Sequence, residues 1–305
     1  MALNLEQPAG RALKRRRGEP AAAPGAARRR RRFSVRPNML VGAALVGMLV
    51  VAGVLAPFIA PYPPDQIQAA LRLQPPSFAH PFGTDAFGRD LYSRVLYGAR
   101  IALYISLLSV LLAAAPGIWL GLLAGYHRGW GDQILSRTMD IWLAFPGLLL
   151  AIVLVARLGP SLDTTVIALG VVGMPSFYRV ARSGTISARH ALYVEAARAL
   201  GIGHTRILWR HILPNLASPL IVLITLRMGT MLLAAGGLSF IGLGAQPPLP
   251  EWGALLATGR DYLDTAWWLA FFPGLAFTLS VTGFNLLGDG LRDVLAPETH
   301  GSATG

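Results

Sequence analysis

The feature that most constrains this chain is a set of apolar runs that are long enough to cross a lipid bilayer. The first run, residues 39–60, contains no charged side chain. At about 1.5 Å per helical residue, it can span the roughly 30 Å of bilayer hydrocarbon. Charged residues make up only 14% of the chain, against about 25% in soluble domains. The predicted class is therefore an all-α integral membrane protein.

Five more apolar runs follow the first, which predicts about six transmembrane helices. The predicted ranges of the last five are 101–126, 139–156, 164–180, 216–243 and 266–287. Prolines lie inside three of them, with Pro116 in the second span, Pro146 in the third and Pro175 in the fourth. Because proline removes a backbone donor, we expect interruptions at these points and a short, broken fourth span.

The chain divides into five predicted parts by composition. The order is a basic disordered cytoplasmic tail (1–38), the first transmembrane helix (39–60), an extracytoplasmic segment (61–100), a helical core (101–290) and a second cytoplasmic tail (291–305). The extracytoplasmic segment begins with several prolines and ends in an amphipathic stretch from Asp90 to Arg100 that leads into the second span.

Loop charges predict the orientation in the membrane. Residues 1–36 carry ten arginines and one lysine against two glutamates. With this tail inside, the net positive loops 127–137 and 179–213 also lie inside, and the acidic loops 159–163 and 244–265 lie outside. The basic tail directly precedes an apolar run, which favours a retained cytoplasmic tail over a folded nucleic-acid-binding domain.

Several kinds of chemistry are excluded by residue types. The chain has no cysteine, so it forms no disulfide, thiolate metal site or cysteine nucleophile. Its six histidines lack metal-ligand spacing. Its only lysine, Lys14, follows Leu13, so the Gly-Lys pair of a phosphate-binding P-loop is missing. If ATP drives this protein, another chain must bind the ATP.

The long inner loop, residues 182–214, has a pattern of two short helices joined at a glycine. Serine and threonine at 183–187 can cap the first helix, and Gly201 stands where a helix ends in a positive-φ residue. Thr205 can cap the second helix, which we expect to stop at Pro214. Such a loop is either a docking element or a hairpin lying on anionic lipid, and its arginine content alone slightly favours the lipid hairpin.

A resemblance favours the docking element. The stretch E-A-A-R-A-L-G at Glu195–Gly201, followed after nine residues by H-I-L-P at His211–Pro214, resembles the E-A-A loop of binding-protein-dependent ABC importer permeases. In that family the loop couples the permease to an ATPase. The resemblance transfers this role to Glu195, Ala196, Ala197, Leu200, Gly201, Leu213 and Pro214.

Other segments resemble the dipeptide, oligopeptide and nickel branch of the same family. They are H-P-F-G-T-D-A-F-G-R-D (80–90), Y-G-A-R-I-A-L (97–103), L-S-F-I-G-L-G (238–244), P-E-W-G (250–253) and F-N-L-L-G-D-G-L-R-D (284–293). A single helix before an extended outer segment is similar to the second of the two permease subunits in such systems.

The resemblance implies a multi-pass, non-catalytic transport subunit in the bacterial cytoplasmic membrane. Its implied partners are a second homologous permease subunit, two ATPase subunits that hold ATP and magnesium, and an extracytoplasmic solute-binding protein. The implied substrates are di- or oligopeptides, with nickel chelates, glutathione or another small solute as alternatives. This chain itself needs no cofactor under that interpretation.

Arg227 is the one charge well inside a predicted span. A charge at that depth costs at least about 2.5–3.5 kcal/mol, so it should face protein or water. It is either a pathway residue that contacts a carboxylate, or part of a structural pair, or a side chain that reaches the interface. A secondary transporter is the rival class, but it would need carboxylates within the spans, and only Asp140, at a span edge, is present. A membrane-bound enzyme is disfavoured, because no nucleophile or acid pair lies in the spans.

Overall fold

The computed structural model describes residues 37–295, and the tails at 1–36 and 296–305 lie outside the described residues. Five helices are long and apolar enough to cross a membrane, or six if one bent pair counts as a span. Four of them are α1 (Pro37–Ile59), α2 (Leu91–His127), α5 (Leu162–Ala188) and α10 (Trp268–Leu295). The fifth is a continuous helix, His204–Phe240, most of which is α8 (Leu213–Phe240). The all-α membrane-spanning class is confirmed.

The third predicted span is two helices rather than one. α3 (Trp130–Ala144) and α4 (Gly147–Leu158) meet at Phe145 and Pro146 with a bend of 90°. Pro146 cannot continue the hydrogen-bond ladder of α3, and it becomes the residue before the first turn of α4. The stretch 127–137, expected to be a turn, belongs mostly to α3.

The expected interruptions at Pro116 and Pro175 were wrong. α2 runs unbroken through Pro116, and α5 runs unbroken through Pro175 and on to Ala188, beyond the predicted span end at residue 180. A membrane helix tolerates a proline when neighbouring groups accommodate the freed carbonyl. Here α2 and α5 pack against each other along their length. Each helix that contains one of these prolines therefore has the other helix as its neighbour.

A stripe of glycines brings α2 and α5 together. Gly117, Gly121 and Gly125 recur every four residues on one face of α2. A Cβ at each would lie 2.6–2.7 Å from a backbone carbonyl oxygen of α5, so no larger residue fits. Close backbone approach through small residues is how membrane helices gain packing energy without a hydrophobic drive. The two helices therefore form the tight centre of the bundle.

The proline-rich segment (residues 60–90) is ordered by buried polar side chains. Asp90 accepts a hydrogen bond from the backbone nitrogen of Ser93 at 2.7 Å, which caps α2, and its other oxygen lies 2.8 Å from Nδ1 of His80. Arg94 donates to the carbonyl of Pro64 at 2.9 Å. Buried polar groups of this kind must be paired, so they fix the path of the segment.

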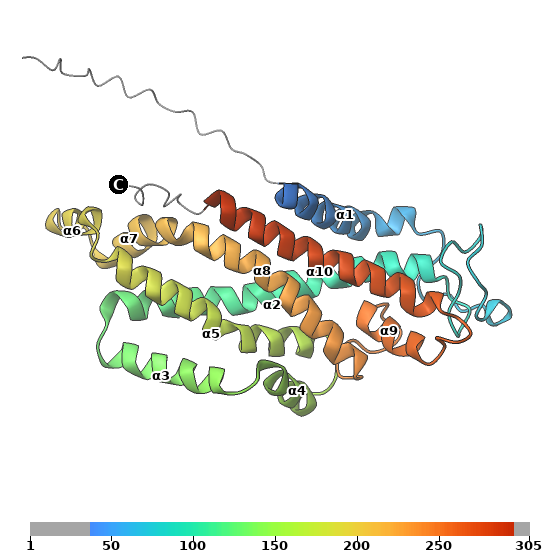
Figure 1. Ribbon diagram of the computed structural model, residues 1–305. Helices are drawn as coiled ribbons and strands as arrows, with labels where there is room; N and C mark the ends of the chain where they lie inside the picture. The colour runs from blue at the N-terminus through green and yellow to red at the C-terminus, as the bar shows by residue number, and fades with distance from the viewer. Residues whose placement is uncertain (1–36, 296–305) are drawn as a thin grey trace, which may run out of the picture. The chain divides into compact units, whose positions relative to one another are not determined.

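Two tryptophans tie this region to the C-terminal half of the chain. The indole of Trp268, at the start of α10, donates to the carbonyl of Thr84 at 3.3 Å, and that of Trp252 in α9 (Trp252–Arg260) donates to the carbonyl of Val95 at 3.0 Å. Glu251 caps α9 through the nitrogen of Ala254 at 2.9 Å, and burial raises the pKa of its carboxyl. α9 and the proline-rich segment lie at the same end of the bundle (Figure 1).

Candidate functional site

The connecting loop (residues 189–212) joins α5 to α8 at the opposite end from α9 (Figure 1). It holds α6 (Leu192–Ala199), α7 (His204–Ile207) and the π-helical turn η2 (Leu208–Ile212). The predicted loop 182–214 was too wide, because α5 continues to Ala188 and α8 already begins at Leu213. Its first helix was also expected to begin near the serines at 183–187, but those residues belong to α5.

α6 has one buried and one exposed face. Val194 and Ala197 are buried, while Glu195 and Ala196 are exposed. Two large apolar side chains, Leu192 and Leu200, are 83% and 80% exposed at the two ends of the helix. Two largely exposed leucines beside a carboxylate, on a helix outside the long apolar helices, suit contact with another protein.

Gly201 forms the elbow after α6. Its φ is +73°, and its own nitrogen donates to the carbonyl of Arg198 at 2.9 Å while that of Ile202 donates to Ala197 at 3.1 Å. This pair of bonds is a Schellman motif, which needs a left-handed residue that glycine adopts without strain. No atom lies within 4 Å of where a Cβ would stand, so the requirement at Gly201 is conformational.

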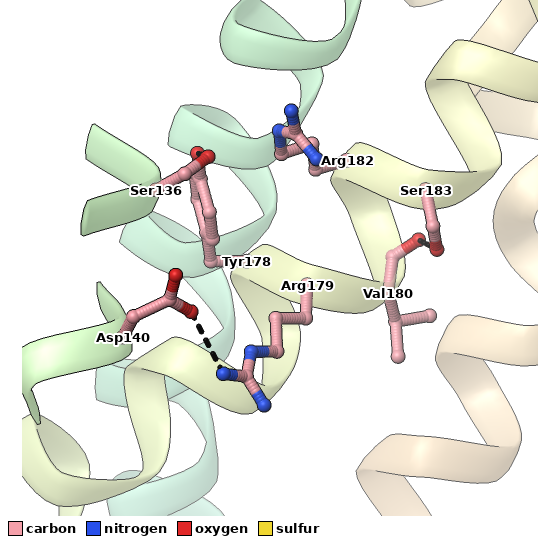
Figure 2. A pocket seen from close by; sticks show the side chains of 7 residues that line it. All are labelled: Ser136, Asp140, Tyr178, Arg179, Val180, Arg182 and Ser183. Carbon is pink, nitrogen blue, oxygen red and sulfur yellow. Dashed lines mark hydrogen bonds and ion pairs between the residues drawn. The ribbon is translucent and has the colours of Figure 1, made fainter. Parts of the chain in front are cut away.

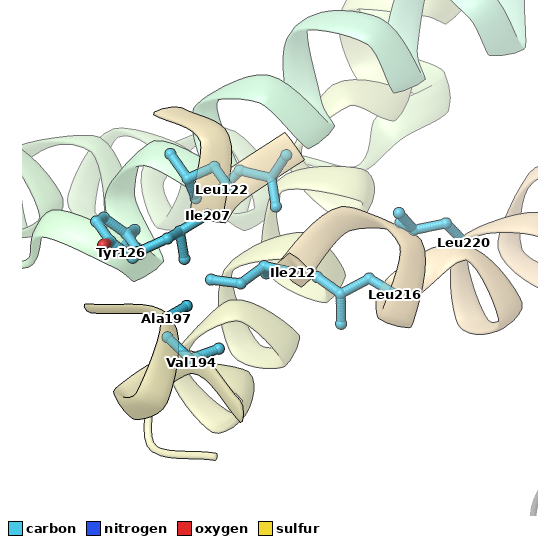
Figure 3. Close-up of a cluster of buried hydrophobic side chains, with 9 residues drawn as sticks. Leu122, Tyr126, Val194, Ala197, Ile207, Ile212, Leu216 and Leu220 are labelled. Atoms are coloured by element: carbon cyan, nitrogen blue, oxygen red, sulfur yellow. The ribbon is translucent and has the colours of Figure 1, made fainter. Parts of the chain in front are cut away.

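The inner face of the loop packs on the end of α2 (Figure 3). One buried apolar cluster contains Leu122 and Tyr126 of α2, two α6 residues, and residues of α7, η2 and α8; the full set is Leu122, Tyr126, Val194, Ala197, Ile207, Leu208, Ile212, Leu216 and Leu220. The loop is therefore anchored to a helix that is neither of its two covalent neighbours.

Tyr126 makes the polar contacts of this anchor. Its hydroxyl lies 2.8 Å from Nδ1 of His204, its carbonyl accepts from Arg189 at 3.1 Å, and the guanidinium of Arg198 lies 5.1 Å from its ring centre. Sequence reasoning missed this residue. Its only signal was an aromatic side chain at a span end, a position where tyrosine is common in any membrane protein.

Leu213 and Pro214 do not end a helix, contrary to expectation. The nitrogen of Leu213 donates to the carbonyl of Leu208, five residues back, and Pro214 lies in the first turn of α8. The wider hydrogen-bond register of the π-helical turn directly before Pro214 accommodates its missing donor within a continuous helix. The π-turn thus joins α7 to α8 without a gap, and Leu213 packs against the buried cluster.

Arg227 lies away from the loop, midway along α8. It is half-buried, and its Nη2 donates to the hydroxyl of Ser176 on α5 at 2.6 Å. No carboxylate in residues 37–295 forms an ion pair with it.

Two ion pairs join α3 to α5. Arg182 donates to Asp132 at 2.8 Å. Arg179 donates to Asp140 at 2.8 Å, and Figure 2 shows this second pair. A groove of about 450 Å³ opens beside them, lined by Ser136, Asp140, Tyr178, Arg179, Val180, Arg182 and Ser183. In the described part of the chain, no group of three or more acidic or histidine side chains is placed to hold a metal ion.

Comparison with known proteins identifies the family. Residues 117–301 match the family described as binding-protein-dependent transport system inner membrane component, and residues 27–76 match the N-terminal TM domain of oligopeptide transport permease C. A dipeptide transport system permease protein of Alkalihalophilus pseudofirmus is 45% identical over 85% of each chain.

Two further relatives carry other substrates in their names. A di/tripeptide transport system permease protein of Pseudomonas aeruginosa is 43% identical over 89% of this chain and 91% of its own. A glutathione transport system permease protein of Pectobacterium atrosepticum is 44% identical over 88% and 89%. The helical bundle, the helix–glycine–helix loop and these matches agree, and the chain belongs to the family of binding-protein-dependent transport system inner membrane components.

Proposed function

We propose that this chain is a permease subunit of an ABC importer that moves di- or oligopeptides across the cytoplasmic membrane. Relatives named for dipeptide and di/tripeptide transport, similar over nearly the whole chain, support the substrate. The proposed partners are a second homologous permease subunit, an extracytoplasmic binding protein and two ATPase subunits, which hold the ATP and magnesium.

The observation that carries the coupling role is the exposed face of α6. Leu192, Glu195 and Leu200 stand free on a helix whose other face is buried in the same chain. We propose that an ATPase subunit covers this face, with Ala196 allowing close approach and Glu195 pairing with a cation of the ATPase. The predicted positions of the E-A-A residues fit this arrangement, with Ala197 on the anchored face and Gly201 at the elbow.

Movement of α6 would then reach the membrane helices by two routes. One route is the π-turn into α8, whose chain is continuous with the loop. The other is the buried cluster and Tyr126, which connect the loop to α2. Since α2 packs closely on α5, we propose that closure of the ATPases shifts these helices together.

The experiment that tests this function measures peptide uptake and subunit association together. Cells lacking this permease should lose uptake of labelled dialanine and regain it when the gene is restored. Glu195→Lys together with Leu200→Asp should reduce co-purification of the ATPase subunits at least tenfold, because a charge is reversed and an apolar contact is lost. Thr205→Ala, at an exposed loop position, is the control. Full ATPase association in the double variant would contradict the docking role.

Glutathione is the second candidate substrate. A relative named for glutathione transport matches this chain as well as the peptide permeases do. Uptake of labelled glutathione, but not of dialanine, by the restored cells would favour this alternative.

A further inference from the structure

Arg227 has more hydrogen-bonding capacity than the chain satisfies. It stands near the middle of α8, fourteen residues from Leu213, which places it about 20 Å along the helix at roughly 1.5 Å per residue. A guanidinium has five N–H donors, and Ser176 accepts from one of them. Since lipid cannot satisfy the rest, this side chain must face protein or water.

The α5 helix continues the polar surface from Ser176 toward the connecting loop. Arg179 and Ser183 follow at three and seven residues, so all three side chains share one face. Both Arg179 and Ser183 are exposed and line the 450 Å³ groove (Figure 2). On α8, Thr230 is exposed one turn beyond Arg227.

The two arginines on this surface differ in their partners. Arg179 is neutralised by Asp140, with both side chains about half exposed. Within residues 37–295, the one side chain that hydrogen-bonds to Arg227 is the neutral hydroxyl of Ser176. In the described part of the chain, this surface therefore carries a positive charge without an ion-pair partner midway along α8 and a paired charge nearer the loop.

We propose that Arg227, oriented by Ser176, binds the carboxylate of the transported solute inside the membrane. The inference rests on the proposed transport of peptides or glutathione, both of which carry a free carboxylate. A planar guanidinium pairs with a carboxylate through two parallel hydrogen bonds, and Ser176 leaves enough donors free for this. Arg179 and Ser183 then offer the next polar contacts along α5.

The absence of cysteine allows a direct test of the charge at this site. Thr230→Cys places a single thiol in the chain, beside Arg227, in the complete importer reconstituted in proteoliposomes. Its labelling is followed on this chain by mass, with an anionic and a cationic methanethiosulfonate reagent offered on both sides. Arg227→Gln should lower the ratio of anionic to cationic labelling rates about tenfold, because a nearby unit charge acts in a weakly polar setting. Arg260→Gln, at the exposed last position of α9, is the matched control and should leave the ratio unchanged.

Substrate protection tests the carboxylate itself. Dialanine should slow anionic labelling of Thr230→Cys severalfold, and dialanine amide should not. Arg227→Gln should reduce dialanine uptake at least tenfold and Arg227→Lys less, because lysine keeps the charge but not the fork. Ser176→Ala keeps the charge and should raise the KM for uptake with a smaller change in maximal rate.

Three outcomes would overturn the proposal. They are an unchanged labelling ratio in Arg227→Gln, equal protection by dialanine and its amide, or loss of the second permease subunit from Arg227→Gln with no protection by dialanine. The last outcome would make Arg227 a structural partner of that subunit. Failure of the wild-type importer to take up dialanine would instead refute the peptide substrate, while the labelling ratio still decides the charge at Thr230.

Discussion

The proline-rich segment and the connecting loop occupy opposite ends of the same bundle and are held in different ways. The proline-rich segment is fixed by buried polar side chains, chiefly Asp85, Asp90 and Arg94. The connecting loop is held by an apolar cluster and by the contacts of Tyr126 with Arg189, Arg198 and His204. The end with the proline-rich segment, hereafter the framed end, is therefore fixed mainly by polar bonds within the chain, whereas the connecting loop is fixed mainly by apolar packing.

The largest expected effect is on stability at the framed end. Arg94→Ala removes the donor to the carbonyl of Pro64 and, of the two described cations that pair with Asp85, leaves Arg89 alone. Breaking a buried charge network typically costs about 3–5 kcal/mol, so we expect a large fall in Tm, measured by thermal unfolding in detergent. Arg100→Ala, an exposed position on the same helix, should change Tm little. Equal Tm values for the two variants would show that this end is not a fixed frame.

A change at the connecting loop should affect transport more than folding. Gly201→Val forces a branched residue to φ near +73°, at a local cost of about 1–3 kcal/mol. We expect uptake to fall at least tenfold while membrane insertion stays normal, measured by transport assay and by the amount of purified protein. Gly203→Ala is the control, because the φ of Gly203 is −60° and space is open there. Normal uptake by Gly201→Val would remove the elbow from the coupling route.

A smaller effect tests whether the loop acts through α2. Tyr126→Phe keeps the ring in the buried cluster and removes only the hydroxyl bond to His204, which is worth about 0.5–1.5 kcal/mol. We expect faster hydrogen exchange in α6 and α7 and a two- to fivefold loss of uptake per ATP hydrolysed. Unaltered exchange in both helices would mean that the apolar contacts alone anchor the loop.

The smallest effect is a pH dependence at the framed end. Burial raises the pKa of Glu251 in the folded protein, so folding favours its protonated form. The associated stability is present at low pH and is lost as pH rises through the folded pKa. Glu251→Gln keeps an acceptor for Ala254 and should flatten the fall of Tm that occurs as pH rises from the pKa of the unfolded carboxyl to the raised pKa of the folded one. A parallel pH profile for both proteins would assign the dependence to other groups.

The sequence was sufficient for the features that depend on local chemistry. Apolar run length located most of the spans, and the glycine requirement at Gly201 followed from helix-ending geometry. The start of the connecting loop was harder to predict from the sequence, because Arg179 and Arg182 lie inside α5. Their partners, Asp140 and Asp132, come from α3. In the sequence alone, such charged residues indicate a loop, because the carboxylates of α3 that pair with them cannot be recognised there.

Prolines were misjudged for a related reason. Pro116, Pro175 and Pro214 look alike in sequence to Pro146, yet only Pro146 accompanies a sharp bend. Whether a proline breaks a helix depends on contacts made by distant segments, such as the packing of α2 on α5, and on the π-turn before Pro214. The Tyr126 contacts and the glycine stripe likewise join residues far apart in the chain.

The continuity of α2 has a mechanical consequence. Its 37 residues extend from the cap at Asp90, in the framed end, to Tyr126 at the connecting loop, a length of about 55 Å at 1.5 Å per residue. A rigid rod of that length, pivoting at one end by about 5°, displaces its other end by about 5 Å, close to one helical turn. A tilt of a few degrees about the capped start of α2, where the buried polar bonds of Asp90 lie, would therefore move Tyr126 at the connecting loop by about one helical turn.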